Sequence, residues 1–142
     1  MKKTINFFEM FAGIGAQHKA FKNLENKLKI KTNSLGTCDF YIDAIVAYML
    51  MHHGTLERET EFSVEQMISL LNKQNFSSNS KNVISKNYFK RMHENKLRKI
   101  FPYLFAYVNN DYFYQKYSLK NKLREREQAE QIYVNILACL NN

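Results

Sequence analysis

The sequence has few of the features that mark secreted, metal-binding or membrane proteins. Its two cysteines, Cys38 and Cys139, are 101 residues apart and have no ligand-like spacing to the histidines, so we expect reduced thiols and no metal site. The longest apolar stretch, residues 44–51, is far shorter than the roughly 20 residues that a bilayer requires. No apolar segment follows Lys2 and Lys3, as a signal peptide would need. We therefore expect a cytoplasmic protein.

Proline and glycine are scarce, with one and four among 142 residues, so each break in the chain is informative. Hydrophobic residues make up 45% and aromatic residues 14%, which is enough for one core and argues against global disorder. Pro102 is expected to interrupt a helix that begins near Lys86.

The first 54 residues have the pattern of a βαβα unit, with a right-handed crossover between parallel strands. The expected elements are strands over residues 4–10 and 35–38 and helices over 16–24 and 42–52. Gly54 is placed to end the second helix. The pattern predicts an α/β fold: an incomplete Rossmann-like unit over residues 1–54.

Residues 55–142 are expected to form a mostly helical, basic, aromatic-rich extension, packed on that unit in a single compact domain. The expected elements are a helix over 64–73 with a capping box from Ser63 to Gln66, a loop over 75–82, and helices over 86–101 and 119–140. Residues 103–117 are too aromatic for their period to separate strand from helix. Because a two-stranded parallel sheet needs cover, a third strand over 103–108, the last helix or a second copy must supply it.

The connection between the first strand and the first helix contains two glycines. Gly13 and Gly15 permit positive φ and carry no Cβ, so backbone amides can close on a ligand at the helix N-terminus. Asp39 follows the second strand, where a carboxylate can accept ribose hydroxyls, and the ring of Phe40 comes next. A tight strand-to-helix connection without a ligand is the alternative for the glycines.

Two stretches, NFFEMFAGIGAQHKAFKNL and CDFYIDAIVAYMLMHHG, resemble the start of the DNA cytosine-5 methyltransferases. The resemblance covers residues 4–54 well, and residues 62–100 are loosely similar to a helical insertion in some phage and bacterial members. It implies S-adenosylmethionine as cofactor. By that resemblance Phe11 would pack on adenine, Gly13 and Gly15 would admit the methionine part, Asp39 would bind the ribose, and Phe40 would replace the usual tryptophan.

The same family attacks cytosine with a cysteine in Pro-Cys-Gln and holds the ring with Glu-Asn-Val. No Pro-Cys occurs in this sequence, and Glu94-Asn95-Lys96 is read as a solvated turn. Without covalent attack, C5 of cytosine is too weak a nucleophile to take a methyl group. We therefore expect a truncated, catalytically incomplete relative and no enzyme activity from the chain alone.

Positive charge is concentrated in residues 81–126, with twelve Lys/Arg against three Asp/Glu. Basic and aromatic residues alternate there, as binding to phosphates and unpaired bases requires. The alternatives are a solvated helix face and aromatic rings in the core. The candidate contacts to nucleic acid or a partner are Lys86, Lys90, Arg91, Lys96, Arg98, Lys99, Tyr103, Tyr107 and Tyr112.

Three functions are compatible with these features. The first is an interaction protein that binds nucleic acid or a nucleoprotein effector such as Cas9, as a phage or mobile-element inhibitor of host defence (anti-CRISPR or anti-restriction). The second is the S-adenosylmethionine-binding subunit of a split cytosine-5 methyltransferase. The third is a stand-alone binder of either ligand, or a fragment without a role. A homodimer through the C-terminal helix is expected, with no metal and no membrane contact.

Overall fold

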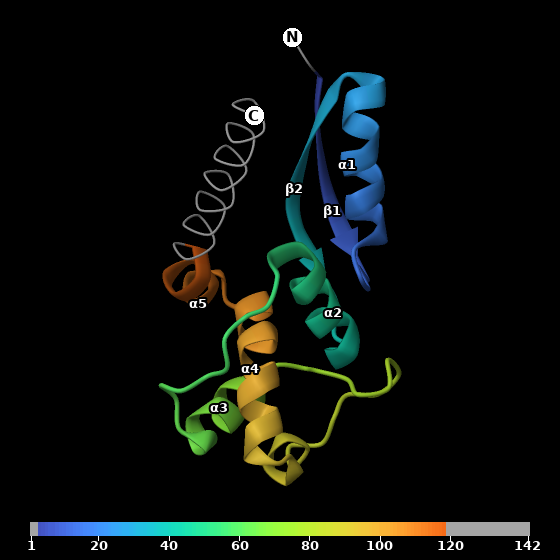
Figure 1. Ribbon diagram of the computed structural model, residues 1–142. Coiled ribbons are helices and arrows are strands. Elements are labelled where there is room, and N and C mark those ends of the chain that lie inside the picture. Colours follow the sequence, from blue (N-terminus) through green and yellow to red (C-terminus); the bar gives the residue numbers. More distant parts are fainter. Residues whose placement is uncertain (1–2, 119–142) are drawn as a thin grey trace, which may run out of the picture. The chain divides into compact units, whose positions relative to one another are not determined.

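The computed structural model describes residues 3–118, and the chain divides into two compact units, residues 1–104 and 105–142. The elements are β1 (Lys3–Met10), α1 (Ala16–Leu28), β2 (Ile30–Cys38), α2 (Ile42–His53), α3 (Val64–Leu71), the 3-10 turn η1 (Phe89–Arg91), α4 (Glu94–Val108), α5 (Asn110–Phe113) and the π-helical turn η2 (Tyr114–Ser118) (Figure 1). The predicted α/β class, with an N-terminal βαβα unit followed by helices, is confirmed. Among the described residues, no helix is both long and apolar enough to cross a bilayer.

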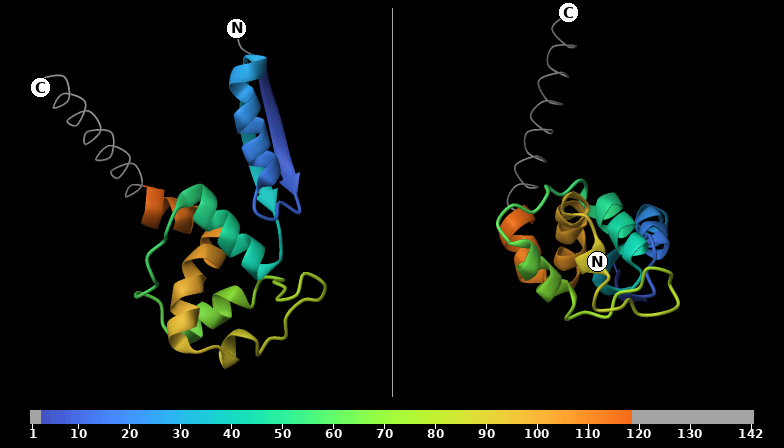
Figure 2. Two further views of the ribbon diagram at one scale, coloured as in Figure 1. Left: turned by 45° about the vertical axis from the view of Figure 1, so that its right-hand side comes forward. Right: turned by 90° about the horizontal axis from the view of Figure 1, so that it is seen from below.

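β1 and β2 form a two-stranded parallel sheet, joined through α1. α1 lies along one face of the sheet (Figure 2). The ring of Phe7 is 4.8 Å from the ring of Phe21, and the backbone amide of Thr32 donates a 2.7 Å hydrogen bond to the carboxylate of Glu25. The hydrogen bond from the Thr32 hydroxyl, together with this one from the Thr32 amide, lowers the pKa of Glu25 to about 2. β2 begins at Ile30 and is longer than the predicted strand.

The end of α2 and the start of α3 lie where the sequence places them, whereas α1 runs to Leu28, beyond the predicted end at residue 24. Gly54 has φ 76° and its amide donates to the Leu50 carbonyl, which ends α2. Ser63 and Gln66 form the predicted capping box at α3, each side chain accepting a hydrogen bond from the other residue's backbone amide.

The core of the first unit lies among its helices and the segments between them. Its most deeply buried apolar side chains are Ile45, Met67, Leu71, Phe76, Phe89, Leu97, Phe101 and Leu104. Phenylalanines of the basic, aromatic part therefore belong to the core. The sheet contributes none of these side chains, because its own apolar residues pack on α1 or face away from it.

The prediction that Pro102 interrupts the helix is wrong. α4 begins at Glu94 and not near Lys86, and Pro102 lies inside it. Residues 103–108, for which a third strand was one alternative, are helical as well. Proline has no N–H to donate to the carbonyl of Arg98, four residues earlier. The backbone amide of Glu59 donates to that carbonyl instead, at 2.9 Å. The helix continues through proline because a neighbouring loop satisfies the carbonyl that proline leaves unpaired.

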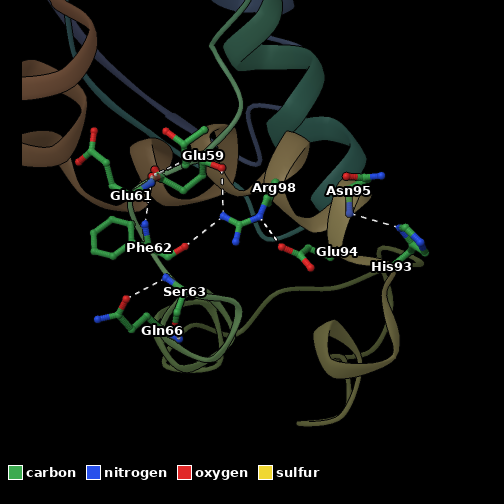
Figure 3. A network of polar contacts seen from close by, with 10 residues as sticks. Glu59, Glu61, Phe62, Ser63, Gln66, His93, Glu94, Asn95 and Arg98 are labelled. Carbon is green, nitrogen blue, oxygen red and sulfur yellow. Dashed lines mark hydrogen bonds and ion pairs between the residues drawn. The ribbon is translucent and has the colours of Figure 1, made fainter.

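The same loop is fastened to α4 by the side chain of Arg98 (Figure 3). The Arg98 guanidinium donates to the carbonyls of Glu59 and Phe62 at 3.2 and 3.1 Å, and to the Glu94 carboxylate at 2.7 Å. The Glu59 side chain is fully buried, and its Oε1 accepts from the amides of the three residues that follow it, Thr60, Glu61 and Phe62. Glu94, Asn95 and Lys96 form the first turn of α4.

The described part of the second unit, residues 105–118, holds the end of α4, α5 and η2. The Asn109 side chain accepts from the Tyr112 amide at 3.0 Å and so caps α5. The ring of Tyr112 is 4.8 Å from that of Phe105. The predicted helix over 119–140, the homodimer through it and Cys139 lie outside the described residues. The predicted division after Gly54 stays a prediction.

We expect Arg98→Met to lower the free energy of unfolding by about 2–4 kcal/mol, because it removes two charge-assisted hydrogen bonds to a loop that also stabilises the proline-containing helix, and a third to Glu94 on the same helix. Urea denaturation measures the change. Lys96→Met and Lys99→Met are matched controls on exposed positions of the same helix, with expected changes within about 0.5 kcal/mol. Equal stability of all three variants would contradict a role of Arg98 in holding the loop.

Candidate functional site

The predicted cofactor residues meet where β1 leads into α1 and β2 leads into α2. Residues 11–15, here called the glycine turn, are held to the end of β2 by two hydrogen bonds. The amide of Ala12 donates to the Cys38 carbonyl at 3.0 Å, and the amide of Gly13 donates to Oδ2 of Asp39 at 2.8 Å. The structure therefore brings Gly13 and Asp39 into direct contact across 26 residues of sequence.

The carboxylate of Asp39 already accepts hydrogen bonds from the protein's own backbone. Its Oδ1 accepts from the amides of Phe40 and Tyr41 at 2.7 and 2.9 Å, in addition to the Gly13 contact on Oδ2. An ionised carboxylate offers about four acceptor positions, so three backbone amides leave about one. About one acceptor position of Asp39 therefore remains for a ligand, and its predicted role in binding the ribose stays a prediction.

Gly15 is required by both its backbone conformation and its surroundings. Its φ is 77°, and a Cβ at this position would lie 2.3 Å from Nε2 of His52 and 2.8 Å from Cε2 of Tyr48. Gly13 has φ 53° but open space around it. Gly13 therefore provides backbone freedom, whereas Gly15 also lets α2 approach the start of α1 closely.

Phe11 is strained and exposed. Its φ of 53° is left-handed, which costs a residue with a side chain about 1–2 kcal/mol. Its side chain is 75% exposed, so the ring is available to a flat ligand beside the glycine turn. Phe40 is partly buried, and its carbonyl accepts from the Ser77 amide at 2.7 Å.

The sequence analysis did not identify Glu9, which lies beneath the glycine turn. Glu9 is 1% exposed, and its Oε1 accepts a 2.9 Å hydrogen bond from the amide of His18, the third residue of α1. Gly15, the N-cap, has no side chain to perform this role, so a carboxylate from β1 caps α1 instead. The sequence feature that could have identified Glu9 is the presence of an acidic residue within the apolar run NFFEMF.

Two histidines connect Glu9 to the glycine turn. Nδ1 of His18 is 3.7 Å from Oε2 of Glu9, and the His18 ring is 4.9 Å from the ring of His52. Nε2 of His52 lies 3.3 Å from the carbonyl of Ile14. Burial, followed by the neighbouring His52, lowers the pKa of His18, and the same two causes lower the pKa of His53.

The lowered pKa values of His18 and His53 favour neutral imidazoles at neutral pH. A helix N-terminus that already receives a carboxylate is a poor place for phosphate. It is better suited to an uncharged or cationic ligand group. Among the described residues, no group of three or more His, Cys, Asp or Glu side chains is arranged to hold a metal ion.

The candidate contacts for nucleic acid or a partner fall into three sets. Five are exposed and lie between residues 86 and 99, here called the basic segment: Lys86, Lys90, Arg91, Lys96 and Lys99. Arg98 is engaged with the loop described above, and Tyr103 is buried, with its hydroxyl accepting from the Leu56 amide at 3.0 Å. Tyr107 and Tyr112 belong to the second unit and are partly buried.

Comparison with known proteins identifies a methyltransferase to which this chain is similar. The chain is 40% identical over 102 residues to the orphan methyltransferase M.SssI of Spiroplasma monobiae. The resemblance to the DNA cytosine-5 methyltransferases is confirmed. The matched stretch is 70% of this chain but only 25% of the relative, so the chain spans about a quarter of that methyltransferase. No protein-family model matches the chain.

The methyltransferase resemblance implies S-adenosylmethionine as the cofactor of the family. Gly13, Gly15, Asp39 and the exposed ring of Phe11 surround one turn in the structure. The roles of these residues in cofactor binding stay predictions.

We expect Gly15→Ala to destabilise the protein more than Gly13→Ala. Both substitutions force a side-chain residue into left-handed backbone, at about 1–2 kcal/mol each. Gly15→Ala must also displace the His52 and Tyr48 rings, so we expect a total of about 2–4 kcal/mol. Urea denaturation of the two variants provides the comparison, and an equal loss in both would show that the close approach of α2 to Gly15 is unimportant.

Proposed function

We propose that this chain is a methyltransferase-like binding protein that holds S-adenosylmethionine at the glycine turn and transfers no methyl group by itself. The observation that carries the proposal is the hydrogen bond between the Gly13 amide and the Asp39 carboxylate. It joins the two parts of the sequence that the methyltransferase resemblance assigns to the cofactor.

The chemistry of the turn supports this ligand. S-adenosylmethionine carries no phosphate, and its sulfonium and ammonium groups outweigh its one carboxylate, in keeping with a carboxylate, Glu9, at the N-terminus of α1. The exposed ring of Phe11 offers a stacking surface for adenine, and Asp39 keeps about one acceptor position for a ribose hydroxyl.

Methyl transfer to cytosine requires a thiolate that this sequence does not supply in the family's Pro-Cys setting. Cys38 is exposed, but it ends β2 and its backbone carbonyl is bonded to the glycine turn. Its position beside Asp39 assigns it to the cofactor side of the site. In the split-enzyme form of the proposal, a second polypeptide with Pro-Cys-Gln completes the chemistry.

We expect calorimetry to detect binding of S-adenosylmethionine to the full chain, and Asp39→Asn to weaken it at least about tenfold, or about 1.4 kcal/mol. The asparagine carries an NH₂ group, which cannot accept from backbone amides on both sides as the carboxylate does. Asp43→Asn is the matched control, since Asp43 is exposed, accepts a hydrogen bond from the Tyr41 hydroxyl and does not contact the glycine turn.

Circular dichroism of each variant separates loss of binding from loss of folding. No binding by the folded wild-type chain would contradict cofactor binding. Transfer of labelled methyl groups to DNA by the chain alone would contradict the proposal that it lacks catalysis.

A second candidate function is binding to nucleic acid or to a nucleoprotein effector, and the basic segment favours it. Its five exposed cations take part in none of the ion pairs found among the described residues, and the single acidic residue of the segment, Glu94, is paired with Arg98. Unpaired surface cations attract phosphates. An inhibitor of a host defence effector such as Cas9, encoded by a phage or mobile element, is the biological setting that we propose for such binding.

We expect the full chain to bind DNA with an affinity that falls as salt rises. The Lys96→Gln and Lys99→Gln variants should each reduce the slope of log affinity against log salt by about 1 if the lysine neutralises one phosphate. Fluorescence anisotropy across a salt series, with single- and double-stranded oligonucleotides, measures the slopes. Lys27→Gln, an exposed lysine in α1, is the control and should leave the slope unchanged. Affinity that is independent of salt would exclude this function.

A further inference from the structure

The face of the sheet opposite α1 is uncovered in the described part of the chain. Side chains alternate along a strand, and Phe7, Glu9 and Thr32 point toward α1. The residues that alternate with them form the opposite face, here called the open face: Thr4, Asn6, Phe8 and Met10 from β1, and Lys31 and Asn33 from β2. We include Leu35, the unpaired residue at the register shift between Ser34, which pairs with Phe7, and Gly36, which pairs with Phe8. All seven are exposed.

The open face carries large apolar side chains. Phe8, Met10 and Leu35 are 51%, 59% and 63% exposed, and the Phe8 ring lies over Gly36, where a Cβ would be 3.0 Å from it. Each strand also has a hydrogen-bonded neighbour on one side only, within the described residues. Parallel sheets in proteins are covered on both faces, and an uncovered apolar face beside unpaired strand edges is a docking surface.

The charge of this surface identifies the kind of partner. The open face holds one charged side chain, Lys31, and residues 1–80 have nine Lys/Arg against eight Asp/Glu. A neutral, apolar surface does not select nucleic acid, whose recognition depends on neutralising phosphates. It fits a polypeptide that contributes an apolar strand or helix.

We propose that the open face docks a methyltransferase polypeptide corresponding to the part of the Spiroplasma relative that this chain does not span. In this proposal, the three quarters of the relative that the match does not cover contain the segments that bury this surface. Phe8, Met10 and Leu35 then become interior residues of a completed sheet. This assignment rests on the proposed methyltransferase-like function, since it supplies the partner that brings the missing thiolate.

The test mixes the full chain with the remaining three quarters of the relative, expressed as a separate polypeptide, and measures complex formation by calorimetry and sedimentation. We expect a complex with the wild-type chain, and at least tenfold weaker binding for Leu35→Asp and for Phe8→Asp. Leu24→Asp is the matched control, because Leu24 is 39% exposed on α1 and lies off the open face. Its binding should equal that of the wild type.

Absence of a complex, or equal binding by the open-face variants and the wild type, would overturn the proposal. A wild-type chain that dimerises by itself, with the dimer lost in Leu35→Asp, would overturn it in favour of a second copy as occupant. Binding of S-adenosylmethionine is measured on the same samples without the second polypeptide. Failure of docking with cofactor binding intact is thus distinguished from failure of the proposed function.

Discussion

The hydrogen bond between the Gly13 amide and the Asp39 carboxylate is the constraint on which the candidate site depends. It ties the glycine turn to the end of β2, and Asp39 in turn binds the amides that begin α2. One carboxylate therefore fixes two strand-to-helix connections at once. The close approach of α2 to Gly15 adds a steric condition to the same place. The turn can be ordered although the sheet is small, because hydrogen bonds at the turn itself hold it in place.

Much of this unit could be predicted because its signals are local. The glycines, the capping box from Ser63 to Gln66 and the glycine at position 54 act within a few residues of themselves, and each has the expected role in the structure. The placement of Asp39 beside the glycine turn was predictable as well. It follows from parallel strands whose ends meet at one edge of the sheet.

The predictions that failed concern residues whose environment is set by a segment distant in the sequence. Pro102 should end a helix, but the Glu59 amide satisfies the carbonyl that proline leaves unpaired, and no sequence pattern links residues 43 positions apart. Arg98 was predicted to contact phosphate from its charge alone, yet its guanidinium binds the carbonyls of the Glu59 loop. Tyr103 was assigned to a surface by composition and lies in the core. Glu9 was missed because its role as a helix cap depends on the N-terminus of α1, which only the folded structure brings beside it.

The surfaces of the first unit differ in chemistry, and this difference constrains what the chain can bind. The open face is apolar and nearly uncharged, whereas the basic segment exposes five cations that form no ion pair among the described residues. Added salt leaves the affinity of a partner that binds through buried apolar area unchanged or higher. It lowers the affinity of a ligand that binds through its phosphate charges. Because the buried core lies among the helices, neither surface is needed to hold those helices together. Both are surfaces for which we propose a role in recognition.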